Sequence, residues 1–135
     1  MKGAKMYKET ITYVDYDGNE WTEDFRFNMS KADLYKLNFK HGGDFEKFLN
    51  SLIEKKDYDG MYSLFEEILF MSYGIKSEDG KRFMKSKEIS ESFTQTEAYS
   101  EFISKMMNDE NYLINFINQV IPHQAASEVM PANNK

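Results

Sequence analysis

The chain has 135 residues, the length of one ordinary domain, and 41% of them are hydrophobic, so we expect it to fold around one substantial core. Its 17 basic and 23 acidic side chains give a net charge of −6, which argues against nucleic acid as a partner. The absence of cysteine excludes disulfides, thiolate nucleophiles and thiolate metal sites.

The first predicted element is a β-hairpin between residues 7 and 28, divided by the turn signal Asp17-Gly18. A three-residue loop with Gly18 in the left-handed region would place Tyr13 opposite Trp21. This loop also gathers apolar residues on one face: Ile11, Trp21, Phe25 and Phe27. A two-residue loop would split that set over both faces, so we favour the longer one. Because an isolated hairpin is only marginally stable, the rest of the chain or a partner must cover this face.

Two amphipathic helices are predicted next. Ser30 and Asp33 match a capping box that opens a helix from Lys31 to about Asn38, and the sequence His41-Gly42-Gly43 ends it. Asp44 then caps a second helix. Its apolar residues recur at helical spacing on one face: Phe45, Phe48, Leu49, Leu52 and Ile53.

The run from Met61 to Tyr73 is apolar nearly all round, which predicts a helix that is central or has two partners. Gly74 stands where a left-handed cap would end this helix. Residues 77–86 carry a turn at 78–81 and are too polar for the core, so we expect a surface connection there.

Three further helices are predicted towards the C-terminus. Ser86 caps a short helix to about Phe93, and residues 94–97 match a capping box for the next one, with Thr94 at its start. The sequence Asn108-Asp109 interrupts that helix, and the last helix stops before Pro122.

These elements predict an α+β fold that is mainly α, with the N-terminal hairpin followed by a compact bundle of about five helices. Residues 1–122 are expected to form a single domain. Residues 123–135 have no periodicity and are expected to form a flexible C-terminal tail.

No motif in the chain predicts catalysis, a cofactor or a metal. The two histidines, His41 and His123, are far apart and both are expected to be exposed. The acidic turns near Gly18 and Gly60 lack the spacing of calcium loops, and the residues around Lys81 do not match a phosphate loop. No stretch approaches the ~18 consecutive apolar residues of a membrane span, and no signal peptide is evident, so we expect a soluble, intracellular protein with no membrane partner.

Protein binding has better support. Phe70 falls on the polar stripe of its helix, one turn after Glu66 and Glu67, where solvent is expected. Methionine adapts to irregular apolar partners. We expect Met71, the pair Met106-Met107 and Tyr112 to extend the apolar surface around Phe70. The candidate protein-binding residues are Phe70, Met71, Met106, Met107 and Tyr112. The alternative for each is burial within the core, and for Phe70 the two alternatives are equally weighted.

Three segments of the chain resemble a known family. The segments are 11–25 around Asp17-Gly18, 73–83 around Gly80, and 93–99 around Thr96. They are similar to the tail assembly chaperones of long-tailed, siphovirus-type bacteriophages, and the similarity runs from about residue 7 to residue 122. Its signature consists of turns and helix caps rather than catalytic residues.

The resemblance implies a non-enzymatic, mainly helical protein of the host cytoplasm that self-associates. Such a protein coats the long, helical tape measure protein, keeps it soluble, helps to recruit the tail tube protein and is absent from the finished virion. A frameshifted extension would join near His123. The family offers no binding motif to transfer by position. The alternative function is a structural tail component of the virion, such as a terminator or connector subunit.

Overall fold

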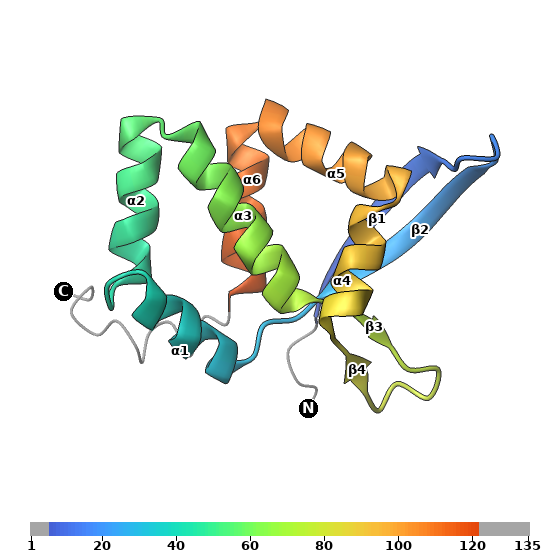
Figure 1. The fold of residues 1–135 in the computed structure, drawn as a ribbon, viewed down its shortest axis with the longest axis horizontal. Helices are drawn as coiled ribbons and strands as arrows, with labels where there is room; N and C mark the ends of the chain where they lie inside the picture. The colour runs from blue at the N-terminus through green and yellow to red at the C-terminus, as the bar shows by residue number, and fades with distance from the viewer. Residues whose placement is uncertain (1–5, 122–135) are drawn as a thin grey trace.

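The computed structural model describes residues 6–121, which form a mixed fold dominated by helices (Figure 1). The elements in chain order are β1 (Tyr7–Val14), β2 (Glu20–Phe27), α1 (Lys31–Lys40), α2 (Phe45–Lys55), α3 (Tyr58–Ser72), β3 (Tyr73–Lys76), β4 (Phe83–Met84), α4 (Lys87–Thr94), α5 (Glu97–Asn108) and α6 (Glu110–Val120). The predicted α+β class is confirmed, with six helices in the described part where about five were expected. The expected tail at 123–135 lies outside the described residues.

The predicted hairpin has the expected loop and register. Strands β1 and β2 pair antiparallel with Tyr13 opposite Trp21. Gly18 has a φ of 88° and donates its N–H to the Asp15 carbonyl at 3.0 Å. The Asp15 N–H donates to the Asn19 carbonyl at 2.8 Å, which closes a three-residue loop. Glycine is favoured here because other residues reach this positive φ only with strain.

The first two helices begin where the sequence predicts. Ser30 and Asp33 form a reciprocal capping box at α1, so both orphan backbone groups are satisfied. At α2, Asp44 accepts from the Lys47 N–H at 3.1 Å. A carboxylate at this position also suits the positive end of the helix dipole.

The capping box predicted for α5 is wrong. Its N-cap is Thr96, whose hydroxyl accepts from the Tyr99 N–H at 3.2 Å. Thr94 is the last residue of α4, and its hydroxyl donates to the Glu91 carbonyl at 2.7 Å. Because α4 runs one residue further than predicted, Thr94 is no longer free to cap the next helix.

The left-handed cap predicted at Gly74 is also wrong. Helix α3 ends at Ser72, and Tyr73 is already extended, with φ −69° and ψ 140°. Gly74 lies in β3 and pairs with Arg26 of β2. A Cβ at Gly74 would lie 2.7 Å from the Phe83 side chain, so glycine is needed here for close packing rather than for a helix cap.

Residues 77–86, predicted as a surface connection, include part of a second hairpin. Strands β3 and β4 pair antiparallel with Ile75 opposite Met84, and Gly80 reverses the chain with a φ of 77°. Together with the first hairpin they form a four-stranded sheet in the order β1-β2-β3-β4. The predicted turn is therefore present, while its flanking strands were missed because they span only four and two residues.

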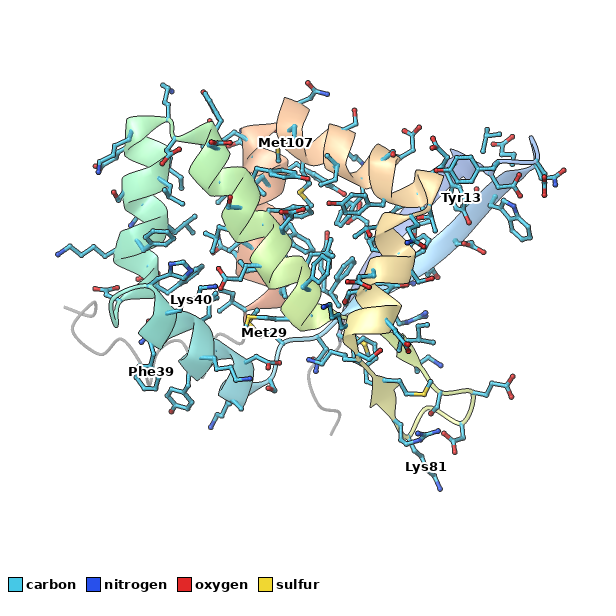
Figure 2. All side chains as sticks on the ribbon, in the orientation of Figure 1. Tyr13, Met29, Phe39, Lys40, Lys81 and Met107 are labelled. Carbon is cyan, nitrogen blue, oxygen red and sulfur yellow. The ribbon has the colours of Figure 1, made fainter. Side chains whose placement is uncertain are left out.

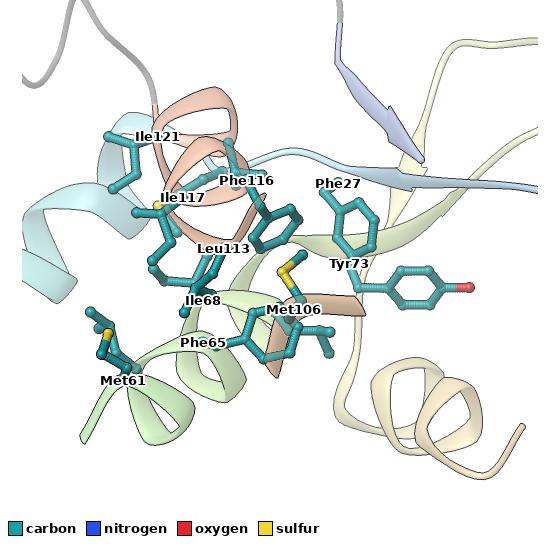
Figure 3. Packing of buried hydrophobic residues seen from close by; sticks show 14 of the residues in the cluster. Phe27, Met61, Phe65, Ile68, Tyr73, Met106, Leu113, Phe116, Ile117 and Ile121 are labelled. Carbon is teal, nitrogen blue, oxygen red and sulfur yellow. The ribbon is translucent and has the colours of Figure 1, made fainter. Parts of the chain in front are cut away.

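Aromatic rings fill the core between the sheet and the helices (Figure 3). Phe27 of β2 lies 5.5 Å from the Phe102 ring and 5.3 Å from the Phe116 ring. Phe65 of α3 lies within 5.6 Å of the same two rings. We call these four residues the aromatic centre. The prediction that the 61–73 helix is central is confirmed, because α3 supplies fully buried residues to this core.

Candidate protein-binding site

Phe70 lies in the last turn of α3 and its side chain is 39% exposed. The burial alternative is therefore wrong for this ring within residues 6–121. Its exposure follows from its place one turn after Glu66 and Glu67, on the side of α3 that faces away from the core. The next residue, Met71, is half-buried and packs against the core.

Glu67 links α3 to the end of α1. Its carboxylate lies 2.8 Å from the Lys40 Nζ and 2.8 Å from the His41 Nε2. Burial opposes the ionisation of Glu67, but hydrogen bonds from Lys40 and His41 outweigh it and hold the pKa of the carboxyl below its usual value. His41 also stacks on Phe48 with ring centroids 4.2 Å apart, so the expectation that His41 is exposed is wrong. His123 lies outside the described residues.

The two adjacent methionines of α5 face in opposite directions. Met106 is 1% exposed, because it continues the inward stripe of Ala98 and Phe102 at four-residue spacing. The expectation that Met106 adds to the surface is therefore wrong. Met107 is 41% exposed and is labelled in Figure 2 at the end of α5. It lines a small apolar hollow together with the exposed ring of Tyr58 at the start of α3.

Tyr112 belongs to a polar cluster rather than to an apolar surface. Its hydroxyl donates to the Glu9 carboxylate of β1, and its ring lies 4.8 Å beneath the Lys105 Nζ. The Tyr7 hydroxyl donates to the same carboxylate, and the Lys105 Nζ lies 3.8 Å from it. Burial, with the hydrogen bond to Glu9, raises the pKa of the Tyr7 hydroxyl. This cluster fixes β1 against α5 and α6.

The five candidate residues thus do not form one patch. Phe70 lies at one end of α3, and Met107 lies beside Tyr58 at the other end. Twelve residues separate Tyr58 from Phe70. This spacing corresponds to about 18 Å along the helix and about a third of a turn around it. The structure therefore offers two apolar contact points that face different directions.

Between residues 6 and 121, no three His, Cys, Asp or Glu side chains lie together in a way that could hold a metal ion. In the same range, no helix has both the length and the apolar composition needed to cross a membrane.

Comparison with known protein families shows the family of the chain. A sequence model of the phage tail assembly chaperone family matches residues 6–134, nearly the whole chain. The chain belongs to this family. Membership gives it a role in the assembly of phage tails, and the family is described as a chaperone rather than as an enzyme. No curated protein and no solved structure matches the chain.

This tail assembly chaperone also exposes aromatic residues that the sequence did not single out. On α1, Phe39 is 73% exposed and stacks on Tyr35 with ring centroids 6.4 Å apart. Their four-residue spacing on one helix face was a signal that could have found them. At the tip of the first hairpin, Tyr16 is exposed, and so is Trp21, which the sequence places on the apolar face that is expected to be covered. Glu9 was missed as well, although alternation along β1 places it on the same face as Ile11.

Proposed function

We propose that this tail assembly chaperone binds the phage tape measure protein, keeps it soluble and promotes assembly of the tail tube. The observation that carries the proposal is the exposure of Phe70, a large apolar ring on the central helix α3. It lies one turn after the carboxylates of Glu66 and Glu67, where a polar residue would be expected. A helical partner docks on such a surface through a few spaced apolar anchors. Phe70 is one such anchor, and the hollow at Met107, which faces another direction, is a separate contact point for a second segment; the polar residues around them keep the unbound surface in water.

The proposal extends to the other partners and to the location. We place the protein in the host cytoplasm, where it acts on the tape measure protein and the tail tube protein, associates with further copies of itself, and is left out of the mature virion. It binds neither nucleic acid nor membrane in this role. The net charge of −6 supports the exclusion of nucleic acid.

Co-expression with the tape measure protein of the same phage tests the Phe70 contact. We expect the wild-type chain to keep the tape measure protein in the supernatant after centrifugation. Phe70→Asp should weaken binding about tenfold, the loss typical of an apolar anchor. Far-UV circular dichroism should show an unchanged fold, because the side chain is part-exposed.

The matched control is Phe39→Asp, which removes a more exposed ring from a different helix. We expect it to leave solubility of the tape measure protein unchanged. Equal loss with both variants, or full activity of Phe70→Asp, would remove Phe70 from the proposal. Met107→Asp tests the second contact point in the same assay.

Mass spectrometry of purified virions separates the proposal from its alternative. A chaperone should be absent from the particles, whereas a terminator or connector subunit should be present in a fixed copy number. Detection at fixed stoichiometry would favour the structural component.

A further inference from the structure

We propose that Lys85 is a positioning residue for the Phe70 contact. Its ammonium group, carried back by the second hairpin, caps the C-terminal end of α3 and fixes the helical turn from which the Phe70 ring projects. The inference rests on the proposed function, because it concerns the same binding residue. Lys85 acts through the backbone of Met71 and needs no contact of its own with the partner.

The C-terminal end of α3 lacks the usual means of capping. Its last turn holds no basic residue, and the chain is already extended at Tyr73 instead of passing through a left-handed glycine. The final carbonyls of a helix have no partner within the helix, so they are satisfied from elsewhere. The Ser72 carbonyl accepts from the Asn28 N–H at 2.8 Å, and the Met71 carbonyl accepts from the Lys85 Nζ at 2.9 Å. The end of the helix therefore depends on distant parts of the chain.

Lys85 meets three acceptors at this helix end. Besides the Met71 carbonyl, its Nζ donates to the Asn28 carbonyl at 3.0 Å and to the Asp33 carboxylate at 3.0 Å. An ammonium group has three N–H donors, so all of them are engaged. A cation at the C-terminal end of a helix also suits the helix dipole. One side chain thus ties the end of α3 to the link after β2 and to the first turn of α1.

Asp33 gives the lysine a charged partner. Burial opposes the ionisation of this carboxyl, but hydrogen bonds from Lys85 and from the Ser30 N–H outweigh it and hold the pKa of Asp33 below its usual value. Asp33 is therefore ionised at neutral pH. The Lys85 and Asp33 side chains are 27% and 22% exposed, so water screens their ion pair less than a surface pair. We therefore expect the pair to hold the lysine in one place.

The second hairpin delivers Lys85 to this helix end. The chain leaves α3 at Ser72, runs through β3 and β4, and returns the lysine to the same end fourteen residues after Met71. Figure 1 shows this hairpin extending from the end of α3. A Cβ at Gly74 would lie 2.8 Å from the Lys85 Cγ, so glycine leaves room for the lysine stem. The short hairpin thus has a role beyond the sheet.

The cap acts next to the exposed ring, because Phe70 immediately precedes Met71. Terminal turns of helices fray when their backbone groups are left unpaired. In a frayed turn the Phe70 ring would take several positions, and a partner would have to fix it at an entropic cost. With the cap in place, the ring is held before binding. We therefore expect Lys85 to raise the affinity for the tape measure protein without contacting it.

Competitive co-purification measures the effect on binding. The tape measure protein of the same phage is co-expressed with two differently tagged full chains, one wild-type and one variant, and the amount recovered with each gives their relative affinity. We expect Lys85→Met, which keeps an apolar stem and removes the ammonium group, to lose about threefold. Lys81→Met is the matched control, at an exposed lysine in the turn of the same hairpin (Figure 2). It should compete equally with the wild type.

A double variant separates positioning from an independent contact. Phe70→Ala should lose about tenfold in the same competition. Adding Lys85→Met to it should cost nothing further, because no ring is left to position. An equal threefold loss in both backgrounds would show that Lys85 affects binding by another route, and would overturn the inference.

Amide hydrogen exchange tests the cap itself. The Tyr73 N–H, which donates to the Leu69 carbonyl, reports on the last turn of α3. NMR of the 15N-labelled full chain should show this amide exchanging about tenfold faster in Lys85→Met, while amides in the middle of α3 keep their rates. A uniform increase along α3 would mean that the lysine only stabilises the whole fold, and would overturn the inference. If Lys85→Met does not fold, Lys85→Gln, which keeps two N–H donors without the charge, carries the same measurements with smaller expected losses.

The outcomes also distinguish this inference from the proposed function. If Phe70→Ala lost affinity and Lys85→Met did not, the inference would fall and the Phe70 contact would stand. If Phe70→Ala kept full affinity, the Phe70 contact itself would fall, and the positioning role with it.

Discussion

Two regions hold the hairpin to the helices in different ways. At the base of β2, Phe27 lies in the aromatic centre, 5.3 Å from the Phe116 ring. On β1, the buried carboxylate of Glu9 accepts from the hydroxyls of Tyr7 and Tyr112. The first contact depends on shape and on removing apolar surface from water. In the contact at Glu9, the loss of any one of the three side chains leaves a buried polar group without its hydrogen-bond partner. We therefore expect the aromatic contact to supply more stability, and the polar one to fix the position of β1.

The largest expected effect is at the aromatic contact. Phe27→Ala should lower the free energy of unfolding by about 3–5 kcal/mol, because it leaves a cavity among close-packed rings. Urea unfolding followed by far-UV circular dichroism measures it. Phe70→Ala, at a part-exposed site, is the control and should cost about 1 kcal/mol or less. Similar losses at the two positions would contradict the comparison.

The polar contact should be the next most sensitive. Glu9→Ala should lower the free energy of unfolding by about 2 kcal/mol, because the hydroxyls of Tyr7 and Tyr112 lose their acceptor. Glu9→Gln keeps one acceptor oxygen and should cost less. The same urea titration ranks the two variants. If the alanine variant were the more stable one, the carboxylate would not be what holds β1 in place.

Acid should weaken a second carboxylate contact while leaving the aromatic one unaffected. The folded pKa of Glu67 is lowered from 4.5, so its ion pairs stabilise the fold above that value and are lost as the pH falls through the lower folded pKa. Glu67→Gln should cost about 1 kcal/mol at pH 7 and approach nothing below that folded pKa. Phe27→Ala should cost the same at both pH values. A pH-independent cost at Glu67 would show that its charge does not matter.

The smallest effect is expected at Lys105, whose side chain is 60% exposed beside Glu9. Lys105→Met should change the free energy of unfolding by about 0.5 kcal/mol or less, because water and salt screen an exposed ion pair. Raising the ionic strength should shrink the difference further. A loss as large as that of Glu9→Ala would mean that the lysine, rather than the tyrosines, satisfies the carboxylate.

Much of the fold follows from local sequence signals. Alternation and Gly18 are enough to set the register of the first hairpin, because a one-residue shift would expose its whole apolar set. The second hairpin could not be predicted in this way, since β3 and β4 are too short to show alternation. The role of Gly74 depends on the approach of Phe83 from β4, which no local pattern records.

The candidate site was predictable only where it depends on one helix. The exposure of Phe70 follows from the polar stripe that Glu66 and Glu67 mark on α3. The contacts of Tyr112 could not be foreseen, because its acceptor, Glu9, lies 103 residues away in the chain. The prediction of one binding surface made of residues from several helices failed for the same reason. The distances between those residues are set by how the helices pack, which the local sequence does not record.

The single tryptophan gives the molecule a built-in optical reporter. Trp21 lies near the tip of the hairpin, exposed, with its indole N–H donating to the Asp15 carboxylate at 2.7 Å. Its emission therefore reports the arm, whereas the far-ultraviolet signal is dominated by the helices. If the arm melts before the helical body, the two optical transitions will not coincide, and the chain will not unfold as a single cooperative unit.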